Sequence, residues 1–69
     1  NTNFLNFEDV DLLREFEENI KLFVKQYIEP YDYVFIDEFQ YAKNGGKHLK
    51  YIYDSYESVK IFISGSSSS

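Results

Sequence analysis

The sequence feature that most constrains the fold lies at residues 33–38, where Tyr-Val-Phe-Ile runs directly into Asp37 and Glu38. An uninterrupted run of β-branched and aromatic residues favours a strand that is covered on both faces, as in a parallel sheet. Two adjacent carboxylates are tolerated at the exit of a buried strand chiefly when a cation compensates their charge. This stretch therefore predicts a strand of a parallel sheet that presents two acidic groups to a cation.

The length of the chain limits it to one core. It has 69 residues, with seven Phe and seven Tyr, and a chain of this size buries roughly 60% of the surface that its unfolded form exposes. We therefore expect residues 1–69 to form a single, partial domain. The chain begins at Asn1 without Met and ends in a serine run, which we interpret as a segment of a longer polypeptide, with residues 65–69 as a flexible serine tail or linker.

Composition argues against several functional classes. The longest apolar runs are far shorter than the ~20 residues that a membrane-spanning helix needs, and the N-terminus does not resemble a signal peptide. The formal charge is −5, from 12 acidic and 7 scattered basic residues, so no footprint for a nucleic-acid backbone is visible. The sequence contains no Cys, which fits a reducing compartment, and we expect a cytoplasmic location.

Apolar periodicity predicts a long helix before the acidic strand. Asp9 or Asp11 can cap its start, because a carboxylate accepts hydrogen bonds from the first unpaired amides, and Pro30 stops it. The apolar positions repeat at helical spacing over residues 12–28 and form one stripe: Leu12, Leu13, Phe16, Ile20, Phe23, Val24, Tyr27 and Ile28.

The remaining elements follow from similar patterns. Residues 3–7 and 59–63 are predicted to be strands, and residues 43–46 a loop. A second helix is expected over residues 47–56, with Leu49, Ile52, Tyr53 and Tyr56 on one face. The order strand, helix, strand, helix, strand predicts half of a doubly wound α/β sheet with parallel strands and right-handed crossovers.

Ligand groups in open parallel sheets gather at the carboxyl ends of the strands. One predicted exit presents Asp37 and Glu38, and the next presents Ser64 and the serines that follow it. We therefore expect acidic and hydroxyl groups to converge on one edge of the sheet.

Residues 33–40, Tyr-Val-Phe-Ile-Asp-Glu-Phe-Gln, and residues 61–67, Ile-Phe-Ile-Ser-Gly-Ser-Ser, resemble the Walker B and sensor 1 strands of AAA-type P-loop ATPases of archaea and bacteria. The residues between them and the strand with its acidic turn at residues 4–9 are similar to the same group, so the resemblance covers nearly the whole chain. It implies a partial three-layer P-loop NTPase fold that lacks the P-loop strand.

The resemblance also implies roles for individual residues and implies ATP and Mg²⁺ as ligands of the whole ATPase. Asp37 would hold Mg²⁺ through its water shell, and Glu38 would orient and polarise the attacking water. Ser66, with Ser64 as the second choice, would stand at sensor 1 and contact the γ-phosphate or that water. Gln40 would couple the nucleotide state to the adjacent loop.

One departure limits these expectations. The phosphate-cradling pattern G-x-x-x-x-G-K-[ST] is absent, and Gly46 and Lys47 cannot replace it because His48 follows where a hydroxyl is needed. We therefore expect no hydrolysis by residues 1–69 alone. The strand at residues 59–63 should also have an exposed edge, since the P-loop strand would pair there, and such an edge favours self-association.

Other interpretations of these residues remain open. The chain could be a non-catalytic, acidic and aromatic-rich interaction module that recruits a partner by strand addition. It could also belong to a different acid-dependent enzyme in which Asp37 joins further carboxylates such as Asp32 or Asp54. Asp37 and Glu38 could be a solvated turn, the tyrosines are expected in the core and its rim, and His48 has no second metal ligand at a suitable spacing.

Overall fold

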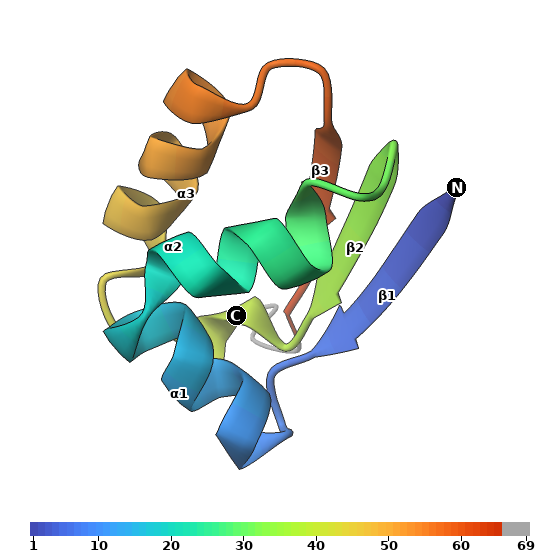
Figure 1. Cartoon of the computed structure of the whole chain (residues 1–69). Helices are drawn as coiled ribbons and strands as arrows, with labels where there is room; N and C mark the ends of the chain where they lie inside the picture. Colours follow the sequence, from blue (N-terminus) through green and yellow to red (C-terminus); the bar gives the residue numbers. More distant parts are fainter. Residues whose placement is uncertain (66–69) are drawn as a thin grey trace.

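The structure is a computed structural model, and it describes residues 1–65. Three strands alternate with helical segments along the chain (Figure 1). In order, the elements are β1 (Thr2–Asn6), α1 (Val10–Glu18), α2 (Ile20–Phe23), the π-helix η1 (Val24–Ile28), β2 (Tyr33–Asp37), the 3₁₀ turn η2 (Phe39–Tyr41), α3 (Gly45–Ser55) and β3 (Lys60–Ile63).

The three strands form one parallel sheet in the order β1-β2-β3. Phe4 of β1 pairs with Phe35 of β2, which in turn pairs with Phe62 of β3, so the three strands are level with one another. The predicted α/β class, the parallel pairing and the helical crossovers are confirmed. The observed ends of the strands lie within one residue of the predicted ends.

Both crossovers lie on the same face of the sheet (Figure 1). This follows from the topology, because right-handed crossovers that step in the same direction place their helices on one side. The described residues therefore form two layers. The prediction that the strand at residues 33–36 is covered on both faces is wrong for this part of the chain: Val34 and Ile36 are buried, but the alternate residue Phe35 is 38% exposed.

The core lies between the sheet and the helices. Three phenylalanine rings form its centre: Phe16 lies 4.9 Å from Phe7 and 5.2 Å from Phe23, measured between ring centroids. Aromatic pairs at such distances add to the stabilisation that comes from burial. Buried aliphatic residues from all three strands and from the helices complete the core: Leu5, Val24, Ile28, Val34, Ile36, Ile52, Val59 and Ile61.

The predicted helix over residues 12–28 is interrupted at Asn19, whose φ of −143° and ψ of 64° are not helical. Its amide closes α1 on the carbonyl of Glu15, and its own carbonyl accepts from Phe23 in the next turn. Asn is a weak helix former that favours such end positions. Phe16 and Phe23, on either side of the break, are both fully buried in the core.

The two ends of this helical crossover match the predicted signals. Asp9 is the N-cap of α1, and its carboxylate accepts from the amides of Asp11 and Leu12. At the other end the Glu29 amide donates to the Val24 carbonyl at 2.8 Å, a five-residue step, immediately before Pro30.

Within residues 1–65, none of the helices combines the length and the apolar character needed to cross a bilayer.

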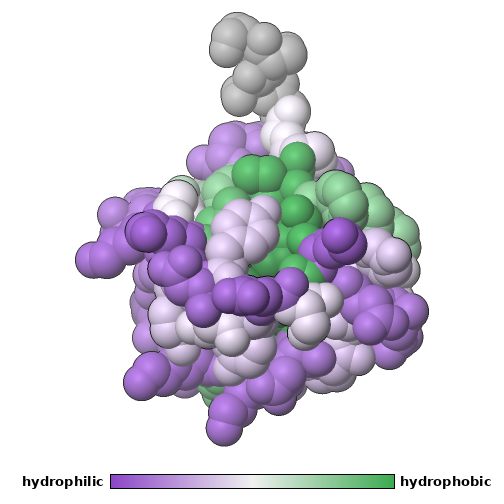
Figure 2. Space-filling model, turned by 90° about the horizontal axis from the view of Figure 1, so that it is seen from above, coloured by the Kyte–Doolittle hydropathy of each residue, from purple (hydrophilic) through white to green (hydrophobic). Residues whose placement is uncertain are grey.

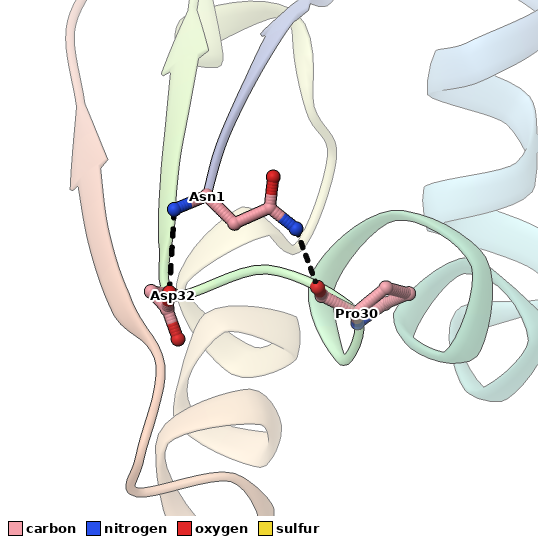
Figure 3. Close-up of polar contacts among 3 residues, drawn as sticks. All are labelled: Asn1, Pro30 and Asp32. Atoms are coloured by element: carbon pink, nitrogen blue, oxygen red, sulfur yellow. Dashed lines mark hydrogen bonds and ion pairs between the residues drawn. The ribbon is translucent and has the colours of Figure 1, made fainter.

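Contacts at the amino end of β1 fix this strand beside β2 (Figure 3). The side-chain amide of Asn1 donates to the Pro30 carbonyl at 3.1 Å, and the amino group of Asn1 lies 3.3 Å from a carboxylate oxygen of Asp32. The backbone amides of Asp32 and Tyr33 both donate to the Asn1 carbonyl. These contacts set the register of β1 at the end opposite to the acidic strand exit.

The face of the sheet away from the helices carries a row of stacked phenylalanines. Phe4, Phe35 and Phe62 come one from each strand, with ring centroids 5.1 Å and 4.9 Å apart. Phe4 is 75% exposed and Phe62 is 47% exposed. Viewed from above, the molecule also shows a hydrophobic area surrounded by hydrophilic side chains (Figure 2). Apolar side chains are thus left open to solvent in the described residues.

Two adjacent glycines at the start of α3 provide a test of the packing. A Cβ on Gly45 would lie 2.8 Å from two ring carbons of Phe39, whereas a Cβ on Gly46 would meet nothing within 4 Å. We expect Gly45→Ala to lower the free energy of unfolding by about 1–3 kcal/mol through overpacking. The matched control Gly46→Ala should leave it unchanged or raise it by up to about 1 kcal/mol, because Ala is the better helix former. Urea denaturation monitored by circular dichroism measures both, and equal effects would contradict this packing.

Candidate functional site at the carboxyl edge of the sheet

Polar side chains from all three strands meet at the carboxyl edge of the sheet. Asn6 ends β1 and pairs in register with Asp37 at the end of β2, while Ser64 directly follows β3. Backbone bonds hold these exits together, since the Ser64 amide donates to the Ile36 carbonyl at 2.9 Å and the Phe7 amide to the Asp37 carbonyl at 3.1 Å. The positions of the side chains are thus set by the sheet.

The Asp37 carboxylate is the centre of this group. Its Oδ1 accepts hydrogen bonds from the Ser64 hydroxyl and from the Glu38 amide, both at 2.9 Å. The expected convergence of an acidic and a hydroxyl group from neighbouring strands is therefore present in the structure. These two donors fix the direction of the carboxylate, which is otherwise exposed to solvent.

Glu38 has an unusual backbone. Its φ of 57° and ψ of 41° are left-handed, which is uncommon for a residue with a side chain. Such conformations cost about 1–3 kcal/mol and persist where the surroundings enforce them, often at functional sites. Here the following residue, Phe39, donates its amide to the Ser64 carbonyl at 3.0 Å. The chain therefore turns sharply at Glu38 to reach the exit of β3.

Of the two candidate sensor residues, the structure describes Ser64 but not Ser66. Ser66, the first choice, lies outside the described residues, so its role stays a prediction. Ser64, the second choice, is the hydroxyl that contacts Asp37. Asn6 was not among the predicted site residues, although its position at the end of a parallel strand is the signal that could have identified it.

The alternative of a different acid-dependent enzyme loses its candidate partners for Asp37. Asp32 lies at the amino end of β2 beside Asn1, and Asp54 lies on α3, where it pairs with Lys50 at 3.6 Å. The described residues contain no cluster of three or more His, Cys, Asp or Glu that could hold a metal ion. His48 is half-buried and packs its ring against Phe16, with 5.1 Å between centroids.

The pKa of Tyr56 is perturbed, but this residue is remote from the carboxyl edge. Burial and then the nearby Glu29 carboxylate raise the pKa of its phenol above 10.0. Tyr56 follows α3 and lies before β3, so it belongs to the amino ends of the strands. The shift therefore reports on packing between helical segments and not on the candidate site.

A groove of about 450 Å³ opens beside the polar side chains of Asn6, Asp37 and Ser64. The three stacked rings of Phe4, Phe35 and Phe62 line it, and Asp37 and Ser64 lie at its carboxyl end. Neither Glu38 nor Gln40 lines this groove. The edge thus has an apolar side formed by the open sheet face and a polar side formed by the loop after β2.

The donor set at this edge fits Mg²⁺. Magnesium is a hard cation that takes oxygen ligands, keeps several waters and uses only one or two protein carboxylates. Asp37 supplies one exposed carboxylate whose direction is fixed by Ser64 and the Glu38 amide. A single oriented carboxylate at a solvent-accessible strand exit matches that preference, while a site built entirely from protein ligands is not available in residues 1–65.

Comparison with known proteins decides the family. A family model described as an AAA domain matches residues 1–69, which is the whole chain. The chain belongs to the AAA domain family. This confirms the resemblance to AAA-type ATPases, and the three parallel strands with their crossovers are compatible with part of a P-loop NTPase fold. No curated protein and no solved structure matches the chain significantly.

The contact between Ser64 and Asp37 can be measured by a double-mutant cycle. We expect Ser64→Ala and Asp37→Ala to show a coupling energy of about 0.5–1.5 kcal/mol in the free energy of unfolding, the usual net contribution of one hydrogen bond. Ser58→Ala, at an exposed turn position, is the control and should show no coupling to Asp37→Ala. Zero coupling between Ser64 and Asp37 would mean that the hydroxyl does not orient the carboxylate.

Proposed function

We propose that this AAA-family chain is part of an ATP-hydrolysing P-loop ATPase. It supplies the carboxylate that binds Mg²⁺ and the carboxylate that orients the attacking water. The observation that carries this proposal is the hydrogen bond from Ser64 to Asp37 at the carboxyl edge of a parallel sheet. This edge is where open α/β sheets bind their ligands, and the family match makes ATP the ligand of choice.

In this proposal Asp37 binds Mg²⁺ through its waters, and Ser64 holds the Asp37 carboxylate in place. Mg²⁺ bound to the nucleotide neutralises charge on the phosphate oxygens. Glu38 orients the attacking water and accepts its proton, a task that a carboxylate next to the metal-side residue can perform. Ser66 remains our candidate for the sensor that contacts the γ-phosphate, and Ser64 takes this position if Ser66 does not.

Hydrolysis requires a phosphate-binding loop, and residues 1–69 do not contain its sequence pattern. We therefore propose that the loop is supplied from outside these residues and that the 69-residue chain alone does not turn over ATP. In the described sheet both outer strands, β1 and β3, have one neighbour only, and we propose that the strand carrying this loop pairs with the free edge of β3. The absence of Cys fits a cytoplasmic setting for the whole ATPase.

The division of labour between the two carboxylates is tested in the complete ATPase. We expect Glu38→Gln to retain ATP binding and to lower turnover by about 10²- to 10⁴-fold, the usual contribution of a general base. Asp37→Ala should instead weaken the use of Mg²⁺ and ATP together. Steady-state turnover and binding of a fluorescent ATP analogue distinguish the two effects. Glu57→Gln, in an exposed turn, is the control, and unchanged turnover in Glu38→Gln would refute the proposal.

A second candidate function is a non-catalytic interaction module, and the unpaired edge of β3 favours it. In the described sheet β3 has a neighbour on one side only. An apolar edge strand with unpaired amides and carbonyls is a template for strand addition, by a partner or by a second copy. The Lys-Ile-Phe-Ile sequence of β3 offers one charge near its start and none near its end.

Self-association of the 69-residue chain tests this second candidate. We expect sedimentation velocity to show association that grows with concentration, and we expect Ile63→Lys to reduce it by introducing a charge at the edge. The control is Leu22→Lys on α2, because Leu22 is 48% exposed and Ile63 is 45% exposed. A chain that stays monomeric at all concentrations, or equal effects of the two substitutions, would argue against the edge.

A further inference from the structure

The loop after β2 contains a side-chain contact that the roles proposed so far do not use. The Gln40 side-chain amide donates a hydrogen bond from Nε2 to Oε1 of Glu38 at 2.5 Å. A short bond to an ionised carboxylate is stronger than a neutral one. Gln40 lies in η2, two residues after Glu38, so the amide reaches back over the turn to the carboxylate.

Gly65 faces this amide from the exit of β3. A Cβ on Gly65 would collide with Oε1 of Gln40 and would lie 3.4 Å from its Cδ. The space that the Gln40 amide occupies therefore exists only because residue 65 has no side chain. Backbone bonds hold the two segments close, since Phe39 donates its amide to the Ser64 carbonyl at 3.0 Å.

From these contacts we infer that Gln40 is a positioning residue, which holds the Glu38 carboxylate and links it to the exit of β3 at Gly65. This inference rests on the proposed function, in which Glu38 orients the attacking water. Glu38 is half-buried and its backbone is left-handed. The bond from Gln40 reaches its carboxylate, whereas the Tyr41 amide donates to the Glu38 carbonyl at 3.2 Å and fixes only the backbone.

The link has a mechanical consequence. Gln40 touches Glu38 with its amide nitrogen and approaches Gly65 with its amide oxygen. A shift of the β3 exit therefore moves the amide, and with it the carboxylate that it holds. A misplacement of about 1 Å in a catalytic group can cost 10²-fold in rate. Glu38 would then be in its working position only when the segment at Ser64 and Gly65 is in place.

Two substitutions remove the link in different ways. Gln40→Ala deletes the donor. Gly65→Ala keeps the donor but displaces it, and it should cost little stability because only the flexible end of the Gln40 side chain must move. Each has a control of the same type: Gln26→Ala, at an exposed position of η1, and Gly46→Ala, where a Cβ meets open space.

In the complete ATPase we expect Gln40→Ala and Gly65→Ala to lower kcat by about 10- to 100-fold while the KM for ATP changes by less than about twofold. Both control variants should keep the kcat of the unsubstituted enzyme. A loss of nucleotide binding would instead raise KM, and a loss of folding would abolish turnover. A lower kcat at an unchanged KM therefore distinguishes a positioning role from a general structural role.

A second readout needs no nucleotide. In the 69-residue chain, NMR should show nuclear Overhauser contacts between the Gln40 side-chain amide protons and the Glu38 side chain. We expect these Overhauser contacts in the unsubstituted chain and in the two controls, Gln26→Ala and Gly46→Ala. Gly65→Ala should lose them, because the added Cβ displaces the Gln40 amide.

The outcomes separate this inference from the proposed function. If Glu38→Gln abolishes turnover but Gln40→Ala and Gly65→Ala keep kcat, the positioning role is overturned and the proposed function stands. If Glu38→Gln leaves turnover unchanged, both fall. If Gln40→Ala does not fold, Gly65→Ala decides, and normal kcat with intact Overhauser contacts in that variant overturns the inference.

Discussion

The structure depends on the parallel pairing of three strands in consecutive order. Because Phe4, Phe35 and Phe62 are level with one another, the strands end at a common edge, and the residues that follow them must lie side by side. The same pairing sends both crossovers to one face of the sheet, where their helices bury a core around Phe16. The site and the core are thus two results of one topology.

The chemistry of the edge arises where the backbone leaves the sheet. Asp37 is still part of β2 and is held by Ser64 from the neighbouring strand. Glu38 is already outside the strand, in a left-handed conformation that points its side chain toward Gln40. Two adjacent acidic residues therefore have different environments, and this difference supports the different roles that we propose for them.

The sheet is unevenly covered, and this has consequences for stability and for partners. One face packs on the helices, while the other presents a row of stacked rings of which Phe4 is the most exposed. Parallel sheets in α/β proteins are almost always covered on both faces. On the side away from β2, β3 has no neighbouring strand in the described sheet, although the Tyr53 hydroxyl donates to the Ile61 carbonyl at 3.3 Å. Residues 1–65 thus leave an apolar sheet face and the edge of β3 open to solvent.

The sequence by itself determined the elements and their order. The apolar run at residues 33–36, the helical stripes and the stop at Pro30 are local patterns, and the acidic pair at the strand exit follows from adjacency in the chain. The resemblance to AAA-type ATPases, confirmed by the family match, also depends on such contiguous patterns. The tertiary structure decided the rest: the break at Asn19, the open sheet face, the contact of Ser64 with Asp37 and the left-handed turn at Glu38. These features depend on which distant residues meet, and a local pattern does not specify such contacts.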